Sequence, residues 1–326
     1  MPFLPSRRGV LAGLAAAPLA RPALAQDGWP RRTITILCPA AAGGATDIIS
    51  RVIAAQLQKT FGVSVVVDNR GGAGGSIATE AGAIAAPDGY TLTMGQLGTL
   101  AVNPFLYPRL KYDPLRDFAP VGLIAQVPMV LVAPPSAGTP DLASFVAKAK
   151  AEPGGIEYGS AGAGSNTHIG MVAFAEAAGV QLVHVPFRGS GALTPLLLSG
   201  SIKAAMSGTP SMLPLIKEKR LDALAVSAPR RIAQLPDVPA IAEFYPGFEA
   251  MQWYGLIAPV RTPAPILARL SAAVNEAIVT PEMTERLASE GAVPDVRSPE
   301  GFRDLIRSES ERWGAIVRRN NLRPGE

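Results

Sequence analysis

Short apolar runs alternate along the chain with segments whose apolar residues recur at helical spacing. The first unit shows the pattern, because residues 33–38 read as a strand, a turn of small residues follows, and apolar residues then recur every three or four positions up to Phe61. Thr46 or Asp47 is expected to cap this helix. Further strands are predicted at residues 64–68, 90–94, 181–185, 204–206, 223–227 and 254–258. This alternation is typical of an α/β protein whose mainly parallel sheets are flanked by helices.

Two apolar runs, residues 118–124 and 129–133, are separated by only a few residues. They predict one extended segment that passes from one domain into another, and a length of 326 residues suits two domains better than one. In the last third of the chain, Thr262, Thr280 and Ser298 each stand before a proline suited to the first turn of a helix. Three consecutive helices are therefore expected to close the chain.

Residues 1–25 have the layout of an export signal: a basic start, an apolar stretch and a cleavage site of small residues that ends at Ala25. The sequence SRRGVL at residues 6–11 is typical of the twin-arginine route, and Arg21 near the cleavage site disfavours the general secretory route. An ordinary secretory signal with paired arginines is the alternative. The cleavage site has no cysteine for a lipid anchor, so both routes predict a free periplasmic protein.

Charge and composition disfavour several classes of function. Removal of the leader leaves 27 basic against 26 acidic residues without a clustered basic run, so a nucleic-acid partner is not expected. After the leader, no membrane-spanning helix is expected, because the longest charge-free stretch, residues 118–140, contains five prolines. Cys38 is the only cysteine, and His168 and His184 are the only histidines. We therefore expect neither a metal site nor a bound cofactor.

Three loops that follow predicted strands are rich in hydrogen-bond donors. The first loop (residues 42–47) and the third loop (residues 160–167) each lead into a helix, where free backbone amides and the helix dipole favour an anion. The second loop (residues 95–99) follows the strand predicted at 90–94. Because the carboxyl ends of parallel strands meet at one crevice, the three loops together predict a site for a carboxylate. Each loop alone could equally be a tight connection that binds nothing.

The sequence lacks the common catalytic motifs. It has no G-x-S-x-G elbow, no complete G-x-G-x-x-G and no G-x-x-x-x-G-K-[ST]. A serine hydrolase that uses Ser165 and His168 remains an alternative, although the sequence indicates no third group that would orient the histidine. His184 lies within an apolar strand and is expected to be a hydrogen-bonded core residue. The residues therefore give little support for catalysis.

Six motifs, taken together and in this order, resemble those of the Bug-type solute-binding receptors of tripartite tricarboxylate transporters. They are GGATD (43–47), DNRGGAGG (68–75), APDGYTL (86–92), YDPLRDFAPV (112–121), HVPFRG (184–189) and LPDVP (235–239). The resemblance covers about residues 29–322. It implies the two-lobed periplasmic binding protein fold, in which two α/β lobes close on a small ligand in the cleft between them, without catalysis.

The resemblance also implies how the chain is divided and what it binds. Residues 26–127 and 223–326 would form lobe 1 and residues 128–222 lobe 2, with a hinge near Val127 and Ser227. The ligand would be a dicarboxylate, a tricarboxylate, an acidic amino acid or an aromatic acid, which a monomeric receptor presents to membrane permease subunits. Two alternatives remain open: a receptor that passes the bound acid to a membrane sensor, and an exported hydrolase on a similar fold.

Ligand contacts are assigned by position in the family's motifs. The predicted ligand-binding residues are Gly43, Gly44, Asp47, Gly98, Thr99, Ala161, Gly162, Gly164, Ser165, Asn166, Phe187, Arg188 and Ser207. Alanines at residues 40–42 replace the paired prolines that are frequent in the family, which predicts looser recognition at the first loop. Ser207 stands where many members carry an acidic residue. Without that carboxylate the cleft no longer favours an ammonium group, so acids without an amine are expected over acidic amino acids.

Overall fold

The computed structural model describes residues 28–324, so the predicted leader and its cleavage site lie outside the described residues. The strands are β1 (Ile34–Cys38), β2 (Val65–Asn69), β3 (Thr91–Gln96), β4 (Phe118–Ala133), β5 (Glu157–Ser160), β6 (Val183–Pro186), β7 (Ala204–Gly208), β8 (Asp222–Val226), β9 (Met251–Pro259) and β10 (Val293–Pro294). The α-helices are α1 (Ala45–Phe61), α2 (Ser76–Ala83), α3 (Asn103–Leu106), α4 (Leu142–Ala151), α5 (Asn166–Ala178), α6 (Ser190–Leu198), α7 (Thr209–Lys217), α8 (Ala264–Ile278), α9 (Pro281–Ser289) and α10 (Pro299–Arg319).

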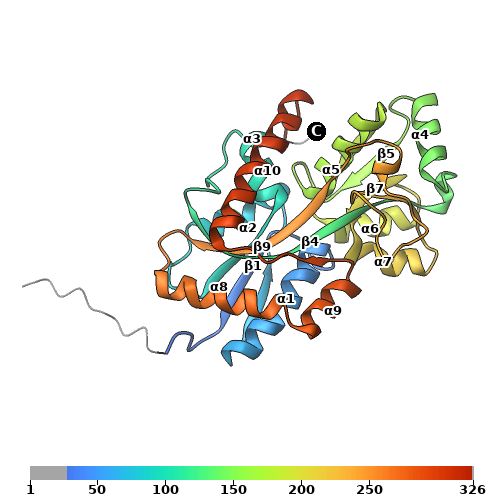
Figure 1. Cartoon of the computed structure of the whole chain (residues 1–326). Coiled ribbons are helices and arrows are strands. Elements are labelled where there is room, and N and C mark those ends of the chain that lie inside the picture. The colour runs from blue at the N-terminus through green and yellow to red at the C-terminus, as the bar shows by residue number, and fades with distance from the viewer. Residues whose placement is uncertain (1–27, 325–326) are drawn as a thin grey trace, which may run out of the picture.

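β4 and β9 connect the two halves of the sheet, as Figure 1 shows. The strand order is β2-β1-β3-β9-β4-β7-β5-β6, with β8 and β10 paired to β4. β4 pairs antiparallel with β9 along its first part and with β7 and β8 along its last part. The outer strands are parallel in both halves, β2, β1 and β3 in one and β6, β5 and β7 in the other. β4 is the extended segment that the two neighbouring apolar runs predict.

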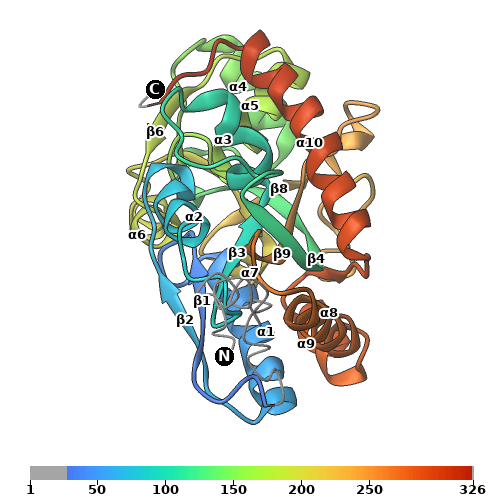
Figure 2. The ribbon, with the colours of Figure 1, turned by 90° about the vertical axis from the view of Figure 1, so that its left-hand side faces the viewer.

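Helices cover both faces of the central strands, so the sheet is buried between two apolar layers. α8 packs on one face of β4 and β9, where Leu256 and Leu270 belong to the same buried cluster. α10 packs on the opposite face, where Trp253 and Trp313 belong to another. Figure 2 shows α8 and α9 together beside the strands, with α10 running past them toward the second half.

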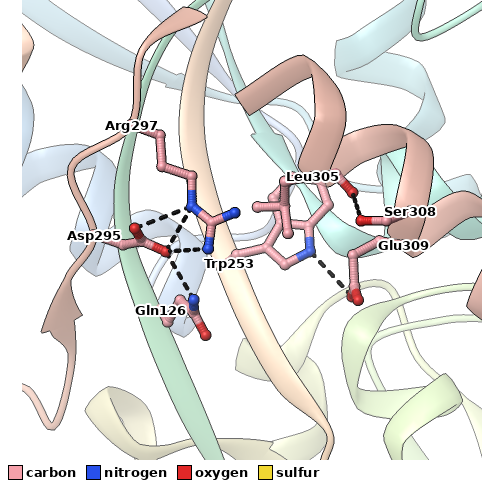
Figure 3. A network of polar contacts seen from close by, with 7 residues as sticks. All are labelled: Gln126, Trp253, Asp295, Arg297, Leu305, Ser308 and Glu309. Atoms are coloured by element: carbon pink, nitrogen blue, oxygen red, sulfur yellow. Dashed lines mark hydrogen bonds and ion pairs between the residues drawn. The ribbon is translucent and has the colours of Figure 1, made fainter. Parts of the chain in front are cut away.

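A polar network joins α10, and the segment between β10 and α10, to β4 and β9 in the middle of the sheet (Figure 3). Gln126 on β4 donates a hydrogen bond of 2.7 Å from Nε2 to Asp295, and Arg297 forms an ion pair of 3.0 Å with the same carboxylate. On β9 the indole N–H of Trp253 donates to Glu309 of α10 at 3.4 Å. These contacts lie beside Val127, where the sequence predicts the hinge.

Ser227 links three segments close to the point where β4 passes from one half of the sheet to the other. Its hydroxyl donates to the carbonyl of Ala250 at 2.7 Å and accepts the backbone N–H of Met129 at 2.8 Å. The side chain is fully buried. This hydroxyl therefore holds together β4, the turn after β8 and the start of β9, where the chain passes between the two halves of the sheet.

Several helix ends differ from the prediction. The N-cap of α1 is Gly44, so capping by Thr46 or Asp47 is wrong: both residues lie in the first helical turn. Thr262 does not cap α8, whose N-cap is Pro263, whereas Thr280 and Ser298 cap their helices with side-chain hydrogen bonds. β5 and β10 are not predicted at all, because they are short and lack an apolar run. Among the described helices, none is long and apolar enough to cross a membrane.

Candidate functional site

A narrow cavity lies at the carboxyl ends of β1, β3, β5 and β7. It encloses about 480 Å³ including its open mouth, and loops from both halves of the sheet line it. The lining residues are Pro39, Ala40, Gly44, Ala45, Thr46, Gly71, Gly72, Gly74, Gly75, Gln96, Ala161, Ser165, Asn166, Thr167, Gly189, Ser190, Ser207, Gly208, Gln252 and Tyr254. This is the common crevice that parallel strands predict.

Five helices begin at this cavity. The N-cap residues of α1, α2, α5, α6 and α7 are Gly44, Gly75, Ser165, Gly189 and Gly208, and all five line it. No Asp, Glu, Lys, Arg or His is among the described lining residues. The unpaired amides of helix N-termini carry partial positive charge, so the cavity favours a negative charge without containing a cationic side chain.

Asp47 braces the first loop from outside the cavity. Its carboxylate accepts the backbone N–H of Gly43 and the side-chain amide of Asn69, both at 2.9 Å, and forms an ion pair of 2.9 Å with Arg51. Burial of Asp47 opposes ionisation, but these three partners outweigh it and lower the pKa of the carboxyl group. Asp47 thus holds the loop that carries Gly44 and does not itself face the ligand space.

Gln96 connects the first loop with the third. Its Oε1 accepts hydrogen bonds from the hydroxyl of Thr46 at 2.9 Å and from the side-chain amide of Asn166 at 3.1 Å. The Oδ1 of Asn166 in turn accepts the N–H of Gly98 at 2.6 Å. Because Oε1 has two donors, the orientation of the Gln96 amide is fixed, and its NH₂ group remains available to a ligand oxygen.

β9 supplies the inner wall through Gln252 and Tyr254, which lie two residues apart and therefore on the same side of the strand. The Tyr254 hydroxyl donates to the Oε1 of Gln252. Complete burial raises the pKa of Tyr254 above its usual range, so the phenol stays neutral. The wall adds polar groups but no charge.

Ser165 and its neighbours shape the third loop. The Ser165 hydroxyl caps α5 by accepting the backbone N–H of His168 at 3.3 Å, and it lies 2.9 Å from the hydroxyl of Thr167. Thr167 also accepts the N–H of Ala161 at 2.8 Å. Ser165 therefore contacts the backbone of His168 and not its imidazole, which is not the arrangement of a serine nucleophile with its base. Among the described residues no cluster of His, Cys, Asp and Glu could hold a metal ion.

Five of the thirteen predicted contact residues line the cavity. They are Gly44, Ala161, Ser165, Asn166 and Ser207. The other eight lie outside the lining: Gly43, Asp47, Gly98, Thr99, Gly162, Gly164, Phe187 and Arg188. Several of these hold the loops instead. The Thr99 hydroxyl donates to the carbonyl of Gln96, and the Gly164 N–H donates to the ring of His168.

Sequence reasoning did not identify Gln96, Gln252 and Tyr254 as residues that line the cavity. Gln96 has a signal in the sequence, since it is the polar residue that ends an apolar strand. Gln252 and Tyr254 have a weaker one, because their apolar surroundings favour a core position. Their role depends on β9 lying between β3 and β4, a long-range pairing.

Comparison with known proteins gives the family. The model of the tripartite tricarboxylate transporter family receptor matches residues 49–322. The chain belongs to this family of receptors. BugT from Bordetella pertussis is 37% identical to it over 307 residues, which cover 94% of each chain. The resemblance read from the six motifs is thereby confirmed.

Solved structures agree with the fold of this receptor. The Rhodopseudomonas palustris protein Rpa4515 with adipate has a TM-score of 0.86 and 33% identity, covering 89% of this chain and 97% of its own. MatC from the same species, with bound malate, has a TM-score of 0.83 and 34% identity, covering 89% and 100%. The two-lobed periplasmic binding protein fold is confirmed, and the family and these neighbours are binding proteins.

Proposed function

We propose that this chain is a periplasmic receptor that captures a small carboxylate without an amino group and presents it to the permease subunits of a tripartite tricarboxylate transporter. One observation carries the proposal: the first turns of five helices surround a cavity whose described lining has no ionised side chain. Helix amides, the hydroxyls of Ser165 and Ser190 and the amide of Gln96 are donors suited to a carboxylate.

The uncharged lining also gives the selectivity. An ammonium group placed in the cavity would lie near the positive ends of several helix dipoles without a carboxylate to pair with, which costs free energy. Ser207, which lines the cavity, does not supply that charge. Dicarboxylates, tricarboxylates and aromatic acids are therefore favoured over glutamate and aspartate. The adipate and malate bound to the two R. palustris neighbours support this class of ligand.

Closure of two lobes would enclose the ligand. We assign residues 26–127 and 223–326 to lobe 1 and residues 128–222 to lobe 2, with the hinge at the crossing segments near Val127 and Ser227. The pairing of β4 supports this division, because its partner changes from β9 to β7 and β8 close to Val127. Ligand contacts from both lobes would stabilise the closed state.

Calorimetric titration tests the ligand class. Residues 26–326 are refolded to remove any copurified ligand and titrated with adipate, malate, citrate, benzoate, glutamate and aspartate. We expect an amine-free acid to bind most tightly, and Ser190→Ala to weaken that binding while Ser289→Ala, on α9 away from the cavity, leaves it unchanged. Tighter binding of glutamate or aspartate than of every other acid contradicts the selectivity, and heatless titrations with all six contradict carboxylate capture.

The transport role has its own test. Uptake of the bound acid into vesicles that contain the permease subunits should require the receptor and should scale with its occupancy. Binding without any stimulation of uptake would favour the sensor alternative.

A further inference from the structure

The two histidines of the chain lie stacked behind the third loop, outside the ligand cavity. The rings of His168 on α5 and His184 on β6 are 4.0 Å apart at 14°, and Tyr158 of β5 stacks against His184 at 5.1 Å. All three line a separate surface cavity together with Glu176, Asn320 and Arg323. His168 is only 3% exposed. None of these side chains lines the candidate site, so the binding chemistry leaves them without a role.

Both imidazoles are nevertheless hydrogen-bonded to the loop that lines the ligand cavity. The N–H of Gly164 donates to Nδ1 of His168 at 3.1 Å. The N–H of Gly162 donates to the hydroxyl of Ser160 at 3.1 Å, and that hydroxyl lies 2.6 Å from Nε2 of His184. Gly162 and Gly164 both have positive φ, +118° and +77°, which glycine adopts without steric cost, and these hydrogen bonds add contacts that hold the loop in this shape.

The bond to His168 specifies a protonation state. A backbone N–H can only donate, so Nδ1 of His168 must carry a lone pair and the neutral ring must carry its proton on Nε2. Protonation of Nδ1 would set two donors against each other and break the contact with Gly164. Ser165, which follows Gly164 in the chain, is the N-cap of α5 and lines the ligand cavity.

We infer that His168 is a positioning residue for the ligand, acting as a neutral acceptor that fixes the Gly164 amide and thereby the first turn of α5 at the cavity. The inference deepens the proposed function and rests on it. The titratable or charged groups that face the two rings are Tyr158 of β5, Glu176 of α5 and Arg323 after α10. Glu176 is already paired with Arg319 at 2.6 Å. Burial, with a smaller contribution from His184, lowers the pKa of His168 to about 3 and keeps the acceptor form at neutral pH.

NMR of the wild-type protein tests the inference directly. In protein labelled with ¹⁵N in histidine, the shifts of His168 should show Nδ1 without a proton and Nε2 with one, and the Gly164 amide should be protected from hydrogen exchange. A proton on Nδ1, or rapid exchange of the Gly164 amide, overturns the inference. This readout needs no ligand, so a failure of carboxylate binding by the wild type counts against the proposed function alone.

A matched pair of variants separates positioning from packing. His168→Asn and His168→Leu both remove the ring, but only asparagine places an acceptor, Oδ1, at the position of Nδ1. With whichever of adipate and malate binds the wild type more tightly, we expect the leucine variant to raise Kd at least tenfold and the asparagine variant to stay within about threefold. Equal losses in both variants, or unchanged affinity in the leucine variant, overturn the inference. If the leucine variant does not fold, the tautomer of the wild type decides.

Discussion

The first and third loops each hold a helix N-terminus at the cavity, but they are stabilised by different side chains. Each leads from a parallel strand into a helix whose N-terminus lines the cavity. In the first loop the bracing group is the carboxylate of Asp47, paired with Arg51, whose side chain is 54% exposed. In the third loop the bracing groups are neutral: the hydroxyls of Ser165 and Thr167 and the imidazole of His168.

The difference follows from solvent access. An ion pair costs less desolvation where one partner reaches water, as Arg51 does, than in the fully buried surroundings of His168. Both arrangements keep charged side chains away from the lining and leave helix N-termini at the cavity. The comparison teaches that a candidate anion site need not contain the charged residues that stabilise it.

The largest expected effect is the loss of the charged brace. Asp47→Ala leaves the Gly43 amide, the Asn69 amide and Arg51 without their shared acceptor, and should lower the free energy of unfolding by about 3 kcal/mol. Denaturant unfolding measures this, and Asp68→Ala is the control, because its ion pair with Arg70 is exposed and worth less than about 1 kcal/mol. Equal effects of the two substitutions would show that Asp47 braces nothing.

Acid should affect the third loop before the first. The pKa of His168 is lowered to about 3, so below the unfolded value of about 6.5 the unfolded chain gains a proton that the folded chain does not, and stability falls as pH falls. Between pH 6.5 and 5 this group accounts for a loss of up to about 2 kcal/mol. The lowered pKa of Asp47 gives stability that is present above its unfolded value, near 4, and is lost only below it. Unfolding followed against pH should therefore show a shallower slope in His168→Asn between pH 6.5 and 5, and an unchanged slope would contradict the assignment.

Contact between the two halves of the site gives the next effect. A Cβ on Gly208 would lie 2.6 Å from the Cβ of Ala45, although the backbone of Gly208 at φ −60° accepts alanine without strain. Gly208→Ala should therefore hinder closure and weaken binding roughly tenfold, about 1.4 kcal/mol, with little change in unfolding. Gly301→Ala in α10 is the matched control, because its Cβ would have only ordinary contacts. Unchanged affinity of Gly208→Ala in calorimetry would show that this contact does not limit closure.

The smallest expected effect comes from removing a helix N-cap, and it should differ between a helix that begins at the cavity and one that begins elsewhere. Ser165→Ala and Ser298→Ala each remove a side-chain cap from a helix and should each cost about 1 kcal/mol of stability. Only Ser165→Ala should also reduce ligand affinity, because α5 begins at the cavity and α10 does not. Thermal unfolding and calorimetry of both variants check this, and equal binding losses would argue against a specific role for Ser165.

The sequence predicts the architecture well, because apolar periodicity marks the strands and Ser298 and Thr280 mark helix starts. It also predicts that loops after parallel strands converge, which brings Gly44 and Ser165 to one cavity. It does not predict which atom of a loop faces inward: Gly98 and Thr99 lie behind the lining, while Gln96 forms part of it. That choice depends on hydrogen bonds between residues 50 to 70 positions apart in the chain, which local patterns do not encode.

The proposed recognition of a carboxylate by helix amides has an evolutionary consequence. A donor that belongs to the peptide bond is lost only through substitution by proline, whereas a donor on an arginine or lysine side chain is lost in one mutational step. The side chains around the cavity, Ser190 and Ser207 among them, are then free to vary and to change the size and shape of the acid that fits. A scaffold of this kind can diverge toward many acids while its affinity for anions is inherited with the backbone.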